Sequence, residues 1–191
     1  SVSGYTEQRD NDYPNSALGL QQDEDSSWGL DISYQPSDTL SISASHQDQT
    51  LDSVTFGSNS FSVRDWTSST LDQVRTTTFD IEKTGLLGSR LDLTLSYIYS
   101  DGAGQYDTEF LNQSSRFPSL ISEHRGINFT ALYRASEILL VKIRYYNEDY
   151  RSADWALDGV TTDTIRNVIG MNLVSPNYGI SLTNISFTYA L

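Results

Sequence analysis

The closing stretch Asn184-Ile-Ser-Phe-Thr-Tyr-Ala-Leu191 decides the fold class. Apolar and polar residues alternate through it, so one face carries Ile185, Phe187, Tyr189 and Leu191. A period of two is that of a β-strand. A strand with one apolar and one polar face is expected in a membrane barrel, where alternate residues meet lipid and lumen. It is also expected at the edge of a soluble sandwich, and this strand alone leaves both open.

The same alternation recurs along the whole chain. It predicts eight strands of about 9–12 residues, the length that a tilted strand needs to cross a bilayer, and a partial strand near residues 1–8. Soluble strands average about five or six residues. We therefore expect an all-β fold, an antiparallel transmembrane β-barrel, to which this chain contributes about 8–9 strands of a larger barrel. The predicted strands begin near Trp28, Leu40, Thr76, Arg90, Ile127, Leu139, Ile165 and Ile180.

Composition narrows the class further. Hydrophobic residues make up 37% of the 191 residues, against about 45–50% in soluble domains. No apolar run approaches the roughly 20 residues of a transmembrane helix. The net charge of −13 argues against nucleic acid, whose phosphates require clustered Lys and Arg. The lack of cysteine excludes disulfides, thiolate metal sites and CxxCH haem attachment within this chain.

The predicted strands are joined by short turns that alternate with long polar segments. Four such segments, about 9–26, 48–72, 101–122 and 149–164, are interpreted as loops. Porins usually place long loops outside the cell, but a final strand normally ends at the periplasmic rim. With a turn at 175–179 inside the last hairpin, that second rule puts the long segments in the periplasm, and this is the side we expect. Aromatic residues at the predicted strand ends suit an interfacial girdle; they are Trp28, Tyr34, Tyr97, Tyr99, Tyr133 and Tyr145.

No constellation in the sequence indicates an enzyme. The two histidines, His46 and His124, stand on different hairpins without an adjacent nucleophile or orienting acid, and we expect both to be satisfied or solvated. Asp10, Asp12 and the run 23–25 form an acidic segment before the Trp28 strand. It lacks the spacing of a calcium loop, so a solvated loop is expected and no metal site is predicted.

Charged residues on the non-lipid face are the candidates for partner contact. Lys142, Arg144 and Glu148 alternate on one strand, and a charge facing lipid would cost about 2–4 kcal/mol. They therefore face either water or a protein in the lumen. The stretch Tyr145-Tyr-Asn-Glu-Asp-Tyr150 leads into a loop in which Asp154, Trp155 and Asp158 are further candidate contacts.

These residues carry a resemblance to a known family. The chain resembles the MtrB/PioB family of outer-membrane porins, which sheathe decahaem c-type cytochromes. The resemblance rests on four motifs: Tyr145…Glu148…Tyr150, Asp154-Trp155-Ala156, Asp158-Gly159-Val160 and Ser175-Pro176-Asn177-Tyr178. It covers residues 1–191 as the C-terminal part of a single, larger barrel domain. The family's N-terminal region, with its CxxC pair in some members, has no counterpart here, and Leu191 stands where Phe is commoner.

The resemblance implies a conduit rather than a redox protein. It places the chain in the bacterial outer membrane, with a decahaem c-type cytochrome in the barrel lumen and an extracellular multihaem cytochrome at the outer rim. The haem would belong to the partner, so this chain would bind no cofactor. Ile185, Phe187, Tyr189 and Leu191 would be the C-terminal signal read by the barrel-assembly machinery. A diffusion porin with a wet lumen and a small closed eight-stranded barrel remain the alternatives.

Overall fold

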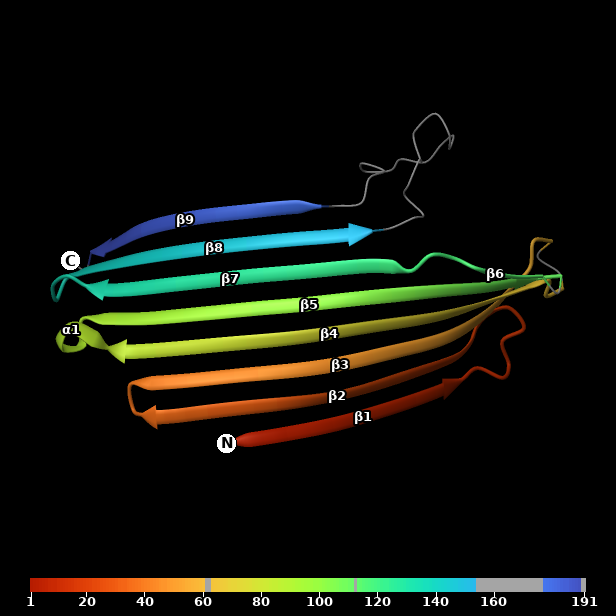
Figure 1. The fold of residues 1–191 in the computed structure, drawn as a ribbon, viewed down its shortest axis with the longest axis horizontal. Coiled ribbons are helices and arrows are strands. Elements are labelled where there is room, and N and C mark those ends of the chain that lie inside the picture. Colours follow the sequence, from red (N-terminus) through yellow and green to blue (C-terminus); the bar gives the residue numbers. More distant parts are fainter. Residues whose placement is uncertain (61–62, 112, 154–176, 190–191) are drawn as a thin grey trace, which may run out of the picture.

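The computed structural model describes residues 1–60, 63–111, 113–153 and 177–189. They form one antiparallel sheet in the order β1-β2-β3-β4-β5-β7-β8-β9, with β6 as a short hairpin partner of β5 (Figure 1). The all-β prediction and the expected number of strands are confirmed. The predicted strand at 165–174 lies outside the described residues. The strands are β1 (Val2–Asp12), β2 (Gly19–Ser37), β3 (Leu40–Gly57), β4 (Trp66–Gly85), β5 (Leu91–Phe110), β6 (Gln113–Arg116), β7 (Leu120–Arg134), β8 (Leu139–Ala153) and β9 (Tyr178–Tyr189).

Three tight connections lie at one end of the sheet, the short-turn end. They follow β2, β4 and β7, close to the predicted turns, and the second contains the four-residue helix α1 (Leu86–Ser89). Gly85 and Gly88 take φ values of +73° and +71° there, a conformation that glycine adopts without steric cost. No helix of the described residues is long and apolar enough to cross a membrane.

The register sorts the side chains onto two faces. Residues paired directly across neighbouring strands share a face, so Ile32, Ala44, Phe79, Tyr97 and Ile127 form one row. Rows like this build an apolar belt, and we call this side of the sheet the belt face and the other the polar face. The belt residues are Leu30, Ile32, Tyr34, Leu40, Ile42, Ala44, Phe79, Ile81, Leu91, Leu93, Leu95, Tyr97, Tyr99, Ile127, Phe129, Ala131, Tyr133, Leu139, Val141, Ile143, Tyr145, Ile185, Phe187 and Tyr189.

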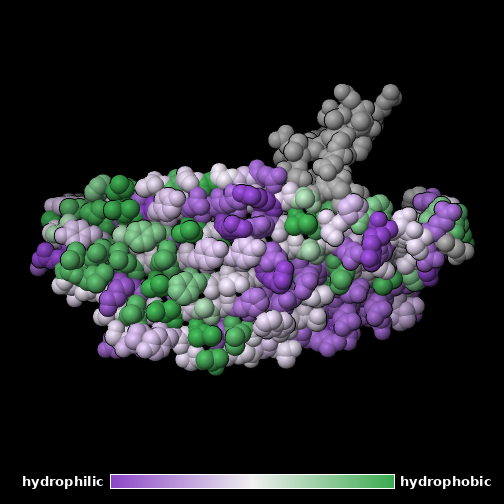
Figure 2. All heavy atoms as spheres, viewed as in Figure 1, coloured by the Kyte–Doolittle hydropathy of each residue, from purple (hydrophilic) through white to green (hydrophobic). Residues whose placement is uncertain are grey.

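The belt is confined to the short-turn half of the strands. Figure 2 shows hydrophobic side chains gathered toward that end of the visible face and hydrophilic ones toward the other. Tyr34 and Tyr133 lie at the short-turn edge of the belt, whereas Tyr99 and Tyr145 lie at its opposite edge with Trp28 one position beyond. The predicted aromatic residues therefore all share the belt face, and all except Tyr97, which lies one position inside Tyr99, mark its two borders, as interfacial side chains do.

The belt runs obliquely across the sheet, and this gives the strand tilt. The row that contains Leu30, the first belt residue on β2, continues through His46, Thr77, Tyr99, Arg125 and Asp149 to Gly179 on β9. On β9 the belt begins only at Ile185, six residues further along than Gly179. A drift of six residues over six strand spacings corresponds to a tilt of roughly 35°, within the range of outer-membrane barrels.

The strands are longer than the sequence predicted. β4 and β5 each have 20 residues and β3 has 18, so much of the predicted loops 48–72 and 101–122 continues the sheet beyond the belt. The prediction failed because both faces of these extensions are polar, and hydrophobic alternation cannot mark a strand that meets water on both sides. The acidic segment 23–25 is likewise part of β2 and not a loop.

The strand direction on which the predicted side of the long segments rested is wrong. β9 pairs directly with β8, with Leu139 opposite Tyr189, so the end of β9 lies at the short-turn end (Figure 1). The sequence had predicted a further strand, at 165–174, between β8 and the final strand. One more strand in that position makes the final strand run in the opposite direction. With the observed pairing, both rules lead to the same expectation, which is short turns at the periplasmic rim and long extensions on the outside.

None of the described side chains is a buried hydrophobic residue, so this part of the chain forms no core of its own. Among the described strands, β1 pairs only with β2 and β9 only with β8, and the sheet is open. An eight-stranded barrel closed on itself would pack side chains in its interior. The described sheet is instead a wall.

Candidate functional site

The polar face is the candidate site, because charges and hydroxyls line it from end to end. Lys142, Arg144 and Glu148 share this face, as predicted, with Asp80 and Glu82 on β4. Arg144 Nε donates to Asn128 Oδ1 at 2.9 Å, and Lys142 is exposed. These two cations therefore present charge to whatever fills the space beside the wall.

Glu148 does not contact them but lies in a cluster of its own with His124, Tyr146, Tyr150 and Tyr178, the Glu148 cluster. Tyr178 Oη donates to Glu148 Oε1 at 2.6 Å, and Tyr146 Oη donates to Oε2. His124 Nε2 lies 3.4 Å from Oε1. The rings of Tyr150 and Tyr178 stack with centroids 5.5 Å apart. The cluster ties β7, β8 and β9 together on the polar face.

The cluster corrects one prediction about the histidines. His124 has an acid beside it after all, because antiparallel pairing places it next to Glu148, 24 residues away in sequence. His46 is satisfied on the other face, with Nδ1 2.9 Å from Thr77 Oγ1. Both histidines are thus satisfied, as expected. The signal for the cluster was the unusual Tyr-rich run 145–150, but the partners of its residues required the register of β7 and β9.

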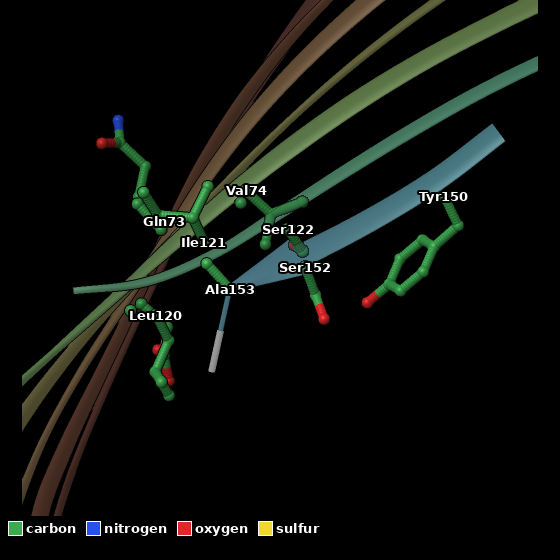
Figure 3. A pocket seen from close by; sticks show the side chains of 12 residues that line it. Gln73, Val74, Leu120, Ile121, Ser122, Tyr150, Ser152 and Ala153 are labelled. Atoms are coloured by element: carbon green, nitrogen blue, oxygen red, sulfur yellow. The ribbon is translucent and has the colours of Figure 1, made fainter. Parts of the chain in front are cut away.

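A hollow of about 560 Å³ adjoins the cluster, toward the extensions (Figure 3). Small residues form it: Gly102, Gly104, Ser122 and Ser152 all line it. A Cβ atom at Gly102 would lie 2.7 Å from Ser122 Oγ, and one at Gly104 would lie 2.6 Å from Asp72 Oδ1. In Figure 3, Tyr150 and Ser152 project from the same side of β8. Ser152 Oγ is buried without a hydrogen-bond partner among the described residues.

Aromatic side chains cover two further glycines of the wall. A Cβ atom at Gly29 would meet the Tyr5 ring at 2.3 Å, and one at Gly57 would meet the Trp66 ring at 1.8 Å. Trp66, predicted in a loop, thus begins β4 opposite Gly57. Such aromatic–glycine pairs across strands fix register, so Tyr5 and Gly29 have a structural role at the border of the belt, and Trp66 and Gly57 have one in the extensions.

Hydrogen bonds hold the acidic residues of β2 in place. Asn11 Nδ2 and Tyr13 Oη donate to the two carboxylate oxygens of Asp23, each at 2.8 Å. These bonds hold the pKa of Asp23 below its ordinary value and raise the pKa of Tyr13. No group of three or more potential metal ligands occurs among the described residues.

Several predicted site residues are outside what the structure describes. Asp154, Trp155 and Asp158 are among them, as is Leu191 at the end of the chain. Ile185, Phe187 and Tyr189 share the belt face as predicted and are well exposed, Phe187 to 69%. Exposed apolar side chains on one face of a strand suit contact with lipid.

An oblique apolar belt, a polar opposite face and a tilt near 35° together define a wall segment of an outer-membrane β-barrel. Residues 1–191 match the model of the MtrB/PioB family of outer membrane beta-barrel porins, and the chain belongs to that family. It is 28% identical over 180 residues to "Outer membrane protein MtrB" of Shewanella baltica (strain OS185). That match covers 94% of this chain and 26% of the relative, so the chain spans about a quarter of the relative's length. The outer-membrane location and the barrel-porin class predicted from the sequence are confirmed.

Proposed function

We propose that this chain forms part of a barrel that holds a multihaem c-type cytochrome in its lumen, so that electrons cross the outer membrane. The haem belongs to the partner in this proposal, and the chain binds no cofactor. Its residues insulate the cytochrome from lipid through the belt face and position it through the polar face. No catalytic step is assigned to the chain.

One observation carries the proposal: the polar face presents charged and hydroxyl side chains, and the described residues form no hydrophobic core on it. The wall has no buried hydrophobic residue among the described ones, yet its polar face presents Lys142, Arg144, the Glu148 cluster and a hollow of about 560 Å³. A narrow barrel fills its interior with its own side chains. A wide one encloses either water or another protein, and the family resemblance favours the protein.

The extensions complete the proposal on the outside of the cell. The short turns and the end of β9 lie together, so the general rules for barrels place the extensions outside. Carboxylates outnumber arginines on them, as in the runs Asp23-Glu-Asp25 and Asp107-Thr-Glu109. We propose that this rim is where an extracellular multihaem cytochrome docks.

The side assignment is tested by labelling. Ser114, on β6, and Glu137, in the turn before β8, are both exposed and lie at opposite ends of the wall. In intact cells, a membrane-impermeant maleimide should modify Ser114→Cys, and should reach Glu137→Cys only after the outer membrane is permeabilised. Labelling of the unsubstituted protein is subtracted as the background. The reverse pattern, in which Glu137→Cys is labelled in intact cells and Ser114→Cys is not, would place the extensions in the periplasm.

The sheath is tested on the full-length protein that carries this chain, purified from outer membranes in mild detergent. A Soret band and a co-eluting haem-staining partner are expected. Lys142→Glu combined with Arg144→Glu should lower the haem recovered per barrel, whereas Lys83→Glu, at the rim of the belt face, should not. A colourless barrel with high ion conductance would instead support the diffusion porin.

A further inference from the structure

Beyond the belt, the outer surface of the wall carries a patch of charged and aromatic residues that the sheath function does not use. The first charged belt-face residue beyond the belt is Arg75 on β4, Asp101 on β5 and Arg125 on β7. Tyr99 lies between the two arginines, directly opposite Arg125 and one position from Asp101 on the same face. We call Arg75, Tyr99, Asp101 and Arg125 the outer arginine patch.

The contacts within the patch hold both guanidinium groups at the surface. Arg75 Nη2 lies 2.5 Å from Asp101 Oδ2, and Arg125 pairs with Glu123. The Arg125 guanidinium also lies 5.5 Å from the centre of the Tyr99 ring. Even so, the side chains of Arg75 and Arg125 remain 54% and 58% exposed. Each arginine has five N–H donors, so one carboxylate partner leaves donors facing outward.

The position of the outer arginine patch along the strands shows which part of the membrane it meets. It begins where the apolar belt ends, beside Tyr99 and near Trp28, whose ring lies 5.2 Å from that of His46. Aromatic side chains of this kind mark the level of lipid headgroups. With the extensions outside the cell, a placement that rests on the proposed function, this level is that of the outer-leaflet headgroups.

We propose that the outer arginine patch binds the phosphorylated sugar headgroup of an outer-leaflet glycolipid, lipopolysaccharide. Guanidinium forks match phosphate oxygens in geometry and charge. Arg75 and Arg125 stand two strand spacings apart and are offset by two residues along the strands, which is about 12 Å in all and suits a headgroup with two phosphates. Tyr99 between them offers a flat surface for the sugar. Asp101 and Glu123 keep the arginines extended and accept hydroxyl groups or share a bridging divalent cation.

The test compares lipid retention by the full-length protein and two variants matched in type. Arg75→Gln with Arg125→Gln removes the patch. Arg116→Gln is the control, because Arg116 lies on the same face further from the belt, is 67% exposed and pairs with Asp107 at 2.9 Å. Each protein is immobilised in mild detergent and incubated with purified lipopolysaccharide, and the bound lipid A is measured by mass spectrometry.

We expect the double variant to retain about five- to tenfold less lipopolysaccharide than the unsubstituted protein, the effect of losing two charge-assisted contacts at an exposed site. The Arg116→Gln variant should retain the full amount. Equal retention by all three, or an equal loss in both variants, would overturn the proposal. β-Sheet circular dichroism checks that each variant is folded.

A ligand-side comparison keeps the test decisive if the double variant fails to fold. The unsubstituted protein should bind enzymatically dephosphorylated lipopolysaccharide and phosphatidylethanolamine more weakly than intact lipopolysaccharide. Inorganic phosphate at a matched concentration should not displace the lipid. Displacement by phosphate would define a simple anion site, and equal binding of all three lipids would show contact with acyl chains only; either result overturns the proposal. Haem recovery, measured separately, reports on the sheath and not on this patch.

Discussion

Tyr178 Oη donates to Glu148 Oε1 across 2.6 Å, and this bond joins β9 to β8 on the polar face. Tyr146 fills the second carboxylate oxygen, and His124 lies beside the first. With 16% of its side chain exposed, Glu148 is the acceptor on which three neighbours depend. The bond therefore adds a side-chain link between β9 and β8 to the backbone pairing of the two strands.

Removing that carboxylate should loosen the end of the wall. Glu148→Ala leaves two phenols and an imidazole without their acceptor, and we expect a loss of about 1–3 kcal/mol in the free energy of unfolding. Urea unfolding of the full-length protein in detergent measures it. Glu137→Ala, in an exposed turn, is the control and should leave the midpoint unchanged. An unchanged midpoint for Glu148→Ala would mean that the cluster does not hold β9.

A methyl group at Gly57 should dislodge Trp66. The added Cβ would lie 1.8 Å from the indole ring, so the ring must leave its place across the strand pair. We expect the emission of Trp66 to shift to longer wavelength as the indole enters water, measured as the difference from Trp66→Phe. Gly179→Ala is the control, because its nearest neighbouring atom is 3.7 Å away. Matching spectra for Gly57→Ala and the parent would contradict the pairing.

An arginine on the belt face should prevent assembly, whereas one on the polar face should not. Ile143 lies within the belt opposite Ala131 and Ile185, and Arg at the middle of the membrane costs about 2–4 kcal/mol. Ile143→Arg should reduce the folded fraction, read from heat-modifiable electrophoretic mobility. Ser96→Arg places the same side chain on the polar face opposite Asp80 and should fold normally. Equal folding of both would reverse the assignment of the faces.

The contact between Tyr13 and Asp23 should stabilise the fold only between an acid and an alkaline pH limit. The folded pKa of Asp23 is lowered, chiefly by the Asn11 hydrogen bond, so its stabilisation is present above the ordinary value of 3.8 and is lost as pH falls through the lower folded value. The folded pKa of Tyr13 is raised above 10.0 by Asp23, so its stabilisation is present below that value and lost as pH rises through the folded one.

Ultraviolet difference titration of the parent against Tyr13→Phe isolates this phenol. We expect it to ionise at higher pH than free tyrosine, and Asp23→Asn should return it toward 10.0 because the neighbouring negative charge is removed. A Tyr13 that titrates at the ordinary value in the parent would show that the hydrogen bond to Asp23 is absent in solution.

The belt was predictable from the sequence and the extensions were not. Alternation around Leu93 or Ile143 is readable because one face meets an apolar phase. Beyond the belt, residues such as Thr50 and Gln73 lie opposite each other with water on both sides of the sheet. No hydrophobic period exists there, and the strand is held by backbone pairing and by pairs such as Trp66 with Gly57.

For the candidate site, the sequence predicted which residues share the polar face but not which of them are in contact. Lys142, Arg144 and Glu148 follow from period two along one strand. Their neighbours do not, because His124 and Tyr178 reach Glu148 only through the register of two other strands. The direction of the final strand depended on the number of strands before it, so one additional predicted strand was enough to reverse the side assignment.

The oblique belt also sets the size of the ring to which this wall belongs. At a tilt near 35° each strand occupies about 6 Å of circumference, so eight strands side by side make an arc of about 50 Å. Closed alone, that arc would be a ring about 16 Å across between backbones, with room only for side chains. A ring that encloses a folded protein about 30 Å wide needs roughly twenty strands. This chain then supplies about two-fifths of the perimeter, and the curvature of the remainder determines how closely its polar face approaches the enclosed protein.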